Sequence, residues 1–346
     1  MPEAGLQYPR SYADLRAWFP EDAACLDYLD WLRWPAGFVC PHCATVGGWR
    51  MTGSVWRCSG CRRRVSATAG TIFQDTRTPL TVWFAAAWYL TSQKNGISAL
   101  GLKRVLGLGS YQTAWAMLHR FRTGMVRPGR EQLKGEVEVD ETYVGGEEPG
   151  LRGGRAKGKK ELVVIAVERR GKGSGRARMA RIPDLSRLSL HGFIKANVEP
   201  GAVIYTDGWP SYGRLEEAGY THKKVSIRAS PDNASELLPC VHRAASLLKR
   251  WLLGTLQGAV EADHLPAYLN EFCFRFNRRR SRARGLLFYR LLQLSAQAPP
   301  ITYRELVVDP RSKRIRPRAP TGPRPNPTSL ARPPVGRPWR EATSLG

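Results

Sequence analysis

The chain has 346 residues, an ordinary hydrophobic fraction of 42% and a formal net charge of +25. This length allows two or three domains, and the excess of positive charge is typical of proteins that bind DNA or RNA, although it can also serve solubility alone. No run approaches the roughly 18 apolar residues of a membrane span. We expect no signal peptide, no membrane association and a cytoplasmic, nucleoid-associated protein of a bacterium.

The N-terminal part combines a helical segment with paired cysteines. Residues 1–37 are expected to be helical, because apolar residues recur at three- and four-residue spacing. Residues 38–70 contain CPHC and CSGC, and two such pairs can supply the four thiolates of a structural zinc site. The alternative is two redox-active pairs. The predicted ligands of Zn²⁺ in this zinc ribbon are Cys40, Cys43, Cys58 and Cys61, with His42 as a bystander.

Basic and aromatic side chains accompany the second cysteine pair. This combination suits contact with nucleic acid, and it equally suits packing against a neighbouring domain. The residues are Arg62, Arg63 and Arg64 after the last cysteine, and Trp49, Trp56 and Arg57 before it.

Residues 79–125 are expected to form a helical module. The sequence GLGS interrupts its last part, and Ser110 is a suitable N-cap for the helix that follows. Two helices around a short glycine-containing turn fit a helix-turn-helix, in which Tyr111 and Gln112 would enter the major groove of DNA. The alternative is an ordinary helical hairpin.

The middle of the chain alternates strand and turn signals. EVEVDETYVGG (136–146) indicates a strand ending at Asp140, with Glu136 and Glu138 on the same face by period-2 alternation. We expect both glutamates to lie toward solvent. Glu141 is expected to point to the opposite side.

A second acid, Asp207, ends the apolar strand predicted over 201–207. The strand and hairpin predicted from residue 161 onward lie between the two aspartates and suffice for a sheet. Aspartates at the ends of adjacent strands can hold Mg²⁺, which prefers hard oxygen ligands and supports phosphoryl transfer. The alternative is that Asp140 and Asp207 cap turns, since Asp-Gly at 207–208 favours a turn.

The remaining segments are helical or lack a core. Residues 240–293 are expected to be helical. The stretch 145–160 is expected to be mobile, and the basic, proline-rich tail 305–346 is expected to be disordered.

Several long motifs resemble one known family. EVEVDETYVGG, IYTDGWPSY, LLKRWLLGT and the cysteine segment occur in the order found in transposases of the IS1595 insertion-sequence family, the ISXO2-like group. The resemblance implies an α/β fold. Its RNase H-like catalytic core, a mixed sheet flanked by helices, would span 133–295 and follow the zinc ribbon and the helix-turn-helix-like module.

The resemblance also implies a DDE-type acidic triad. Asp140 and Asp207 match its first two acids, and Lys249 matches the lysine that follows the third. Such proteins often carry glutamate at the third position, where this chain has His242. A neutral imidazole can bind a divalent ion, which would favour Mn²⁺ over Mg²⁺, or it can act through water; it can also be a surface histidine at a helix start. Nearby oxygen donors that could replace it are Asn233 and Glu236.

The implied activity is cleavage and strand transfer at insertion-sequence ends with two Mg²⁺ or Mn²⁺ ions. The partners would be double-stranded DNA, as terminal inverted repeats and target, and a second copy of the chain in a homodimer or higher oligomer. A non-catalytic zinc-ribbon regulator, an inactive transposase copy and a nuclease acting on RNA–DNA hybrids are the alternatives.

A basic run, FCFRFNRRRSRARG (272–285), ends one of the expected helices. We expect its phenylalanines inside and its arginines on DNA, with a solvated charge run as the alternative. Lys249 would hold a DNA phosphate near the ions. The DNA contacts predicted for this half of the chain are Lys249, Arg250, Arg275, Arg278 and Arg279.

Overall fold

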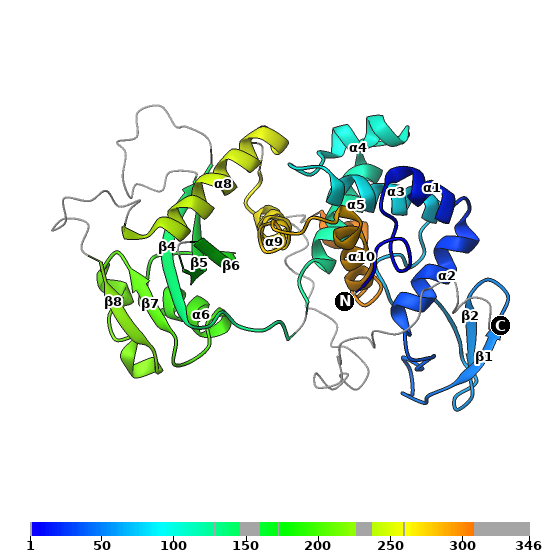
Figure 1. Cartoon of the computed structure of the whole chain (residues 1–346), viewed down its shortest axis with the longest axis horizontal. Coiled ribbons are helices and arrows are strands. Elements are labelled where there is room, and N and C mark those ends of the chain that lie inside the picture. The colour runs from blue at the N-terminus through cyan, green and yellow to red at the C-terminus, as the bar shows by residue number, and fades with distance from the viewer. Residues whose placement is uncertain are drawn as a thin grey trace. The chain divides into compact units, whose positions relative to one another are not determined.

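The computed structural model divides the chain into two units, shown in Figure 1. One unit joins Met1–Gly129 to Ser281–Gly346, and the other is Arg130–Arg280. Most of the expected mobile stretch 145–160 and the tail beyond residue 307 lie outside the described residues, as do Asn233 and Glu236. The described residues are 2–127, 129–145, 160–171, 173–225, 237–258 and 260–307.

The first unit is built mainly from helices around an aromatic core. Phe19 packs edge-on against Phe84 with ring centroids 4.7 Å apart, and Phe84 packs against Phe288 at 5.9 Å. The helices are α1 (Tyr12–Trp18), α2 (Asp22–Arg33), α3 (Leu80–Ser92), α4 (Ala99–Leu106), α5 (Tyr111–Gly124), α10 (Arg284–Ser295) and α11 (Tyr303–Leu306).

Helices α4 and α5 are separated by a short turn that the sequence specifies locally. Gly107 ends α4 with a left-handed backbone, φ 62°, which glycine adopts without steric cost. Ser110 begins α5, and its side chain accepts a hydrogen bond from the Thr113 amide at 3.4 Å. The predicted N-cap is therefore present.

The zinc-ribbon segment forms a small antiparallel sheet in the same unit. Its strands are β1 (Gly48–Met51), β2 (Val55–Cys58) and β3 (Arg64–Ser66), in the order β1-β2-β3.

The second unit contains a five-stranded mixed sheet of order β6-β5-β4-β7-β8. Strand β4 pairs antiparallel with β5 and β5 with β6, whereas β4–β7 and β7–β8 pair in parallel. This strand order and direction are those of an RNase H-like sheet, as predicted. The strands are β4 (Glu136–Val144), β5 (Glu161–Arg170), β6 (Gly173–Arg181), β7 (Val203–Thr206) and β8 (Thr221–Lys224).

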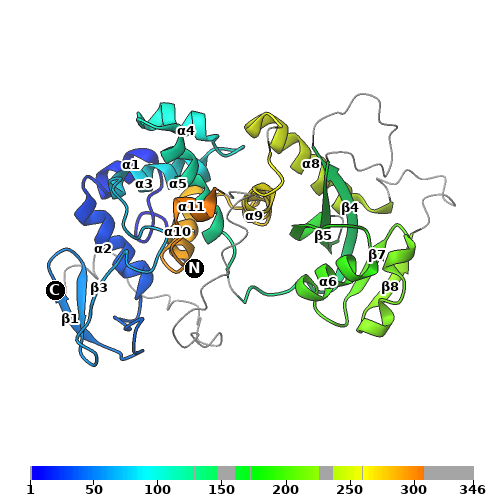
Figure 2. The same cartoon turned by 180° about the vertical axis from the view of Figure 1, so that it is seen from behind.

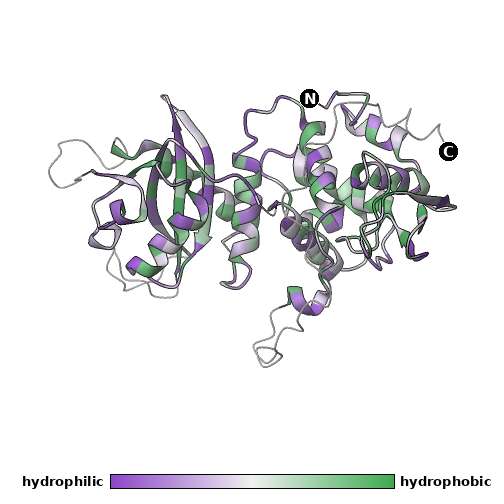
Figure 3. Ribbon diagram, turned by 90° about the horizontal axis from the view of Figure 1, so that it is seen from below, coloured by the Kyte–Doolittle hydropathy of each residue, from purple (hydrophilic) through white to green (hydrophobic). Residues whose placement is uncertain are grey.

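Helices cover both faces of this sheet, as Figure 2 shows from behind. Helix α6 (Arg187–Asn197) packs on one face, and α8 (Pro239–Leu256) and α9 (Leu265–Phe276) pack on the other. Strand β5 alternates Val163, Ile165 and Val167 toward α8 and α9 with Leu162, Val164 and Ala166 toward α6. Burial on both faces explains why its sequence is a continuous apolar run. Figure 3 shows hydrophobic segments in green among hydrophilic ones in purple along the strands and helices.

The helical core of the first unit includes a segment that was expected to belong to the catalytic core. That core was expected to end at residue 295, whereas the compact second unit ends at Arg280. Helix α10 packs with α3 instead, because its buried Phe288 joins the aromatic core.

Across the described ranges, every helix is too short or too polar to span a lipid bilayer.

A buried ion pair fastens β5 to β6. Glu168 is only 2% exposed, and its carboxylate accepts hydrogen bonds from Arg176 Nη2 at 2.6 Å and from the Lys134 amide at 3.2 Å. Burial raises the pKa of Glu168, but the hydrogen bonds and charge of Arg176 and the Lys134 amide outweigh it, so the net pKa is lowered.

Replacing this carboxylate is expected to destabilise the chain in a pH-dependent way. The folded-state pKa of Glu168 lies below its unfolded value of about 4.3, so its stabilisation is present above that pH and is lost as pH falls through the folded pKa. Glu168→Gln should lower the free energy of unfolding by about 3 kcal/mol at neutral pH, as for a broken buried ion pair. Urea unfolding at pH 7 and pH 3 measures both effects.

The matched control is Glu161→Gln in the same strand. Glu161 pairs with Arg181, whose side chain is 36% exposed, so this change should cost no more than about 1 kcal/mol. Equal losses for the two variants, or the same loss for Glu168→Gln at pH 3 and pH 7, would contradict the assignment.

Candidate active site and zinc centre

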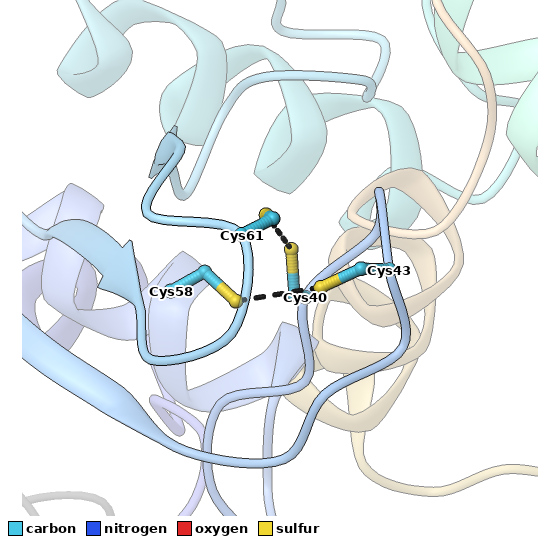
Figure 4. A group of neighbouring side chains, drawn as sticks. All are labelled: Cys40, Cys43, Cys58 and Cys61. Atoms are coloured by element: carbon cyan, nitrogen blue, oxygen red, sulfur yellow. Dashed lines mark hydrogen bonds between the residues drawn. The ribbon is translucent and has the colours of Figure 1, made fainter.

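The four predicted cysteines converge at one point of the zinc ribbon, as Figure 4 shows. The Sγ atoms of Cys40 and Cys61 lie 3.6 Å apart, those of Cys43 and Cys58 lie 3.5 Å apart, and all four lie within 4.8 Å of one another. Four converging thiols form a closed tetrahedral set suited to structural Zn²⁺. His42 is outside this group, as predicted.

Local backbone geometry explains the convergence. After each pair the chain turns back through a left-handed residue, Ala44 at φ 58° and Arg62 at φ 60°. Their amides donate to the carbonyls of Cys40 and Cys58 at 2.9 and 3.1 Å. Hydrogen bonds with Thr45 lower the pKa of Cys43 to about 6, whereas burial and hydrogen bonds with the other three cysteines raise the pKa of Cys61 to about 11.

The two tryptophans of the ribbon have different environments. The Trp56 ring stacks on Phe38 with centroids 5.1 Å apart, and its Nε1 donates to Asp30 of α2 at 2.6 Å. Trp49 is 51% exposed, and the Arg62 guanidinium lies 4.8 Å from its ring centre. Packing thus accounts for Trp56, while Trp49 and Arg62 face solvent.

The other residues predicted to contact DNA in this unit are also exposed. Arg63 and Arg64 lie beside the cysteine site, and one guanidinium nitrogen of Arg63 lies 3.3 Å from Nδ1 of His42. Tyr111 is 47% exposed and Gln112 is exposed at the start of α5.

An acidic cluster lies at the junction of β4 and β7 in the second unit. The two strands run in parallel with Glu138 opposite Tyr205, a register that brings Asp140 level with Asp207, the residue after β7. One carboxylate oxygen each from Asp140, Glu141 and Asp207 lies within 4.8 Å of the others. The two aspartates predicted from the sequence are therefore brought together.

The expectations for Asp140 and Glu141 were wrong. Asp140 does not end β4, which continues to Val144 because its pairing with β5 extends that far. Glu141 does not lie apart from the other acids. Its Oε2 accepts a hydrogen bond from Tyr212 at 2.8 Å, and its carboxylate joins the cluster.

Asp207 also has the turn role considered as an alternative. Its Oδ1 accepts a hydrogen bond from the Trp209 amide at 2.9 Å, and Gly208 has φ 79°. A side-chain–amide bond of this kind fixes one carboxylate oxygen. The turn thus orients Asp207 and is compatible with its place in the cluster.

The environments of Glu136 and Glu138 differ. Glu136 is exposed, as expected, and accepts a hydrogen bond from the Tyr205 hydroxyl at 2.8 Å. Glu138 was expected to face solvent but is fully buried, with 0% exposure, because α8 covers it. It lies 2.9 Å from Arg169 Nε in an ion pair.

His242 lies in the first turn of α8 and faces Asp140. Its Nε2 is 3.9 Å from Asp140 Oδ2, is buried, and has no hydrogen-bond partner among the described residues. Burial lowers the pKa of His242, against the opposing effect of the Glu138 and Asp207 carboxylates, which favours the neutral imidazole. A neutral, unpartnered ring nitrogen beside carboxylates fits a metal ligand.

The residues predicted to contact DNA in the second unit lie on α8 and at the end of α9. Lys249 and Arg250 are exposed on α8. Arg278 donates to the Phe274 carbonyl at 3.1 Å, and Arg279 donates to the Gly175 carbonyl at 3.1 Å. The phenylalanines of the basic run, Phe272, Phe274 and Phe276, are buried as predicted, and Arg275 is half-buried.

The sheet order and the acidic cluster together define an RNase H-like protein of the class that processes nucleic acids. The chain belongs to the IS1595 family of transposases. Residues 132–277 match the ISXO2-like transposase domain and residues 20–64 match the transposase zinc-ribbon domain, together more than half of the chain. It is also similar to the uncharacterized protein in transposable element ISH50 of Halobacterium salinarum, with 26% identity over 280 residues, 74% of this chain and 91% of that protein.

Proposed function

We propose that this protein is an active transposase that cleaves and joins DNA at the ends of an insertion sequence. The observation that carries the proposal is the acidic cluster of Asp140, Glu141 and Asp207 beside an unpartnered His242 nitrogen. A non-catalytic DNA-binding regulator has no use for such a cluster, because grouped carboxylates repel one another unless a cation neutralises them. Membership of a transposase family supports the same reading.

The same four side chains fit divalent metal. Asp140, Asp207 and Glu141 offer hard oxygen donors, and His242 offers a neutral nitrogen. When bound, Mg²⁺ or Mn²⁺ supplies charge neutralisation at a phosphate and makes an attacking water or 3′-hydroxyl more acidic. Tyr212 holds Glu141 in place by its 2.8 Å hydrogen bond, and the Trp209 amide holds Asp207.

We assign DNA binding to the exposed cations and aromatics. Lys249 and Arg250 are exposed on the helix that carries His242, which supports assigning them to DNA phosphates near the acids. In the other unit, Trp49, Arg62 and the start of α5 are exposed and are assigned to the terminal inverted repeats. Pairing two such ends requires at least two copies of the chain on DNA.

A strand-transfer assay separates the transposase from the regulator. Full-length zinc-loaded protein is mixed with DNA fragments carrying the element's inverted repeats, a target plasmid and Mg²⁺ or Mn²⁺. The proposal predicts metal-dependent joined products, whereas a regulator would bind the fragments without joining them. Binding without joining under both metals would reject the proposal.

His242, at the third position of the predicted triad, should determine which metal ion supports faster joining. Because imidazole suits Mn²⁺ better than Mg²⁺, wild-type joining should be about tenfold faster with Mn²⁺. His242→Glu restores a carboxylate beside Asp140 and should reduce this ratio toward one. Joining rates measured with each metal test this, with His264→Glu, a change at a histidine at the start of α9 outside the acidic cluster, as control. An unchanged ratio in His242→Glu would remove His242 from the ligand set.

A further inference from the structure

We propose that Glu138 is a positioning residue that fixes His242 against the acidic cluster by anchoring the start of α8. This inference rests on the proposed function, because it concerns how the metal-binding side chains are held. Glu138 is not itself in the cluster: the carboxylates that converge there are Asp140, Glu141 and Asp207.

Glu138 performs the capping role that α8 lacks locally. Helix α8 begins after Leu238, which makes no side-chain cap, and Pro239 occupies its first position. Glu138 Oε2 instead accepts the amides of Cys240 and Val241 at 2.8 and 2.9 Å. A carboxylate reaching across from β4 thus satisfies two amides of the helix N-terminus, where negative charge is also favoured by the helix dipole.

Glu138 is close to the proposed metal ligands along two elements, the strand β4 and the helix α8. Along β4, Glu138 precedes Asp140 by one full strand repeat, so both side chains lie on the face covered by α8. Along α8, the bonded amide of Val241 directly precedes His242. The same carboxylate therefore sets the distance between the strand that carries Asp140 and the helix turn that carries His242.

A residue of the neighbouring strand β5 also holds Glu138 in place. Arg169 of β5 lies 2.9 Å from Glu138 Oε1, and its guanidinium lies 4.4 Å from the ring centre of Tyr205 in β7. Tyr205 precedes Asp207 by two residues. Arg169 therefore connects Glu138 to the strand that leads to the second aspartate, and the buried carboxylate is held in one orientation.

Mn²⁺ affinity tests this role without relying on activity. Full-length zinc-loaded protein is titrated with Mn²⁺, and free Mn²⁺ is measured by electron paramagnetic resonance. Glu138→Gln should bind Mn²⁺ about 10–100-fold more weakly than wild type, the loss typical when a residue that orients a metal ligand is removed. Glu136→Gln is the matched control on the same face of β4. It keeps an acceptor for Tyr205 and should stay within about twofold of wild type.

A double-mutant cycle distinguishes positioning from general stability. If Glu138 acts through His242, adding Glu138→Gln to His242→Ala should weaken Mn²⁺ binding no further. Additive losses, or unchanged affinity in Glu138→Gln, would overturn the inference. Glu138→Asp keeps the charge but shortens the reach to α8, and it carries the test if Glu138→Gln does not fold. Failure of both variants to fold would assign Glu138 to folding alone.

The same titration separates this inference from the proposed function. Asp140→Asn should weaken Mn²⁺ binding whether or not Glu138 positions His242. If Asp140→Asn binds Mn²⁺ as tightly as wild type, the metal site itself is rejected. If Asp140→Asn weakens binding and Glu138→Gln does not, only the positioning role is rejected.

Discussion

Asp140→Asn and Asp207→Asn are each expected to reduce the rate of strand transfer by at least about a thousandfold. This loss is larger than the roughly 10–100-fold typical of residues that orient metal ligands without binding the metal themselves. Each change removes one charge from a cluster whose oxygens lie within 4.8 Å of one another. Because the two carboxylates would act as a unit, the double variant should be no slower than either single variant. Joining rates with Mn²⁺ and binding of inverted-repeat DNA should be measured together.

The matched control for these variants is Glu199→Gln, an exposed acid in the same unit. It should change the joining rate by no more than about twofold. Both aspartate variants should still bind the inverted repeats, because binding is assigned to other residues. Joining that survives in either variant, or losses that multiply in the double variant, would show that the cluster is not the catalytic centre.

Loss of zinc is the second large effect expected. In small zinc domains the free energy of metal binding, about 10–16 kcal/mol, is largely folding free energy. Cys58→Ser removes a fully buried member of the quartet, so zinc content should fall from one ion per chain and the ribbon strands should become protease-sensitive. Binding to the inverted repeats should fall with it. Elemental analysis, limited proteolysis and DNA binding measure these effects.

Cys25→Ala provides the control for the zinc prediction. Cys25 is buried in α2, outside the quartet, so this variant should keep one zinc ion and a protease-resistant ribbon. A zinc-free wild-type protein that resists protease over residues 38–66 as well as the zinc-loaded form would show that the metal does not hold the ribbon.

Much of the fold could be predicted because local chemistry specifies it. The apolar run from residue 161 indicated a strand, Ser110 indicated a helix start, and the cysteine spacing indicated the four-thiol group. Period-2 alternation also placed Glu138 and Asp140 on one face of β4, which the structure confirms. These features depend on neighbours close in sequence.

The errors arose where distant segments meet. Glu138 is buried because α8, which begins about a hundred residues later, covers it, and no pattern within β4 signals that contact. Glu141 reaches the cluster because Tyr212, far along the chain, lies beside it. The sequence does show that Glu141 is an acid next to Asp140. The alternation of side chains along a strand, however, predicted that Glu141 points to the opposite face.

The most direct test of the account is the position of metal in a crystal of the full-length protein soaked in Mn²⁺. Anomalous scattering should place manganese in direct contact with carboxylate oxygens of both Asp140 and Asp207. Manganese bound only elsewhere, or an empty site between these two side chains at a concentration that supports strand transfer, would contradict the assignment.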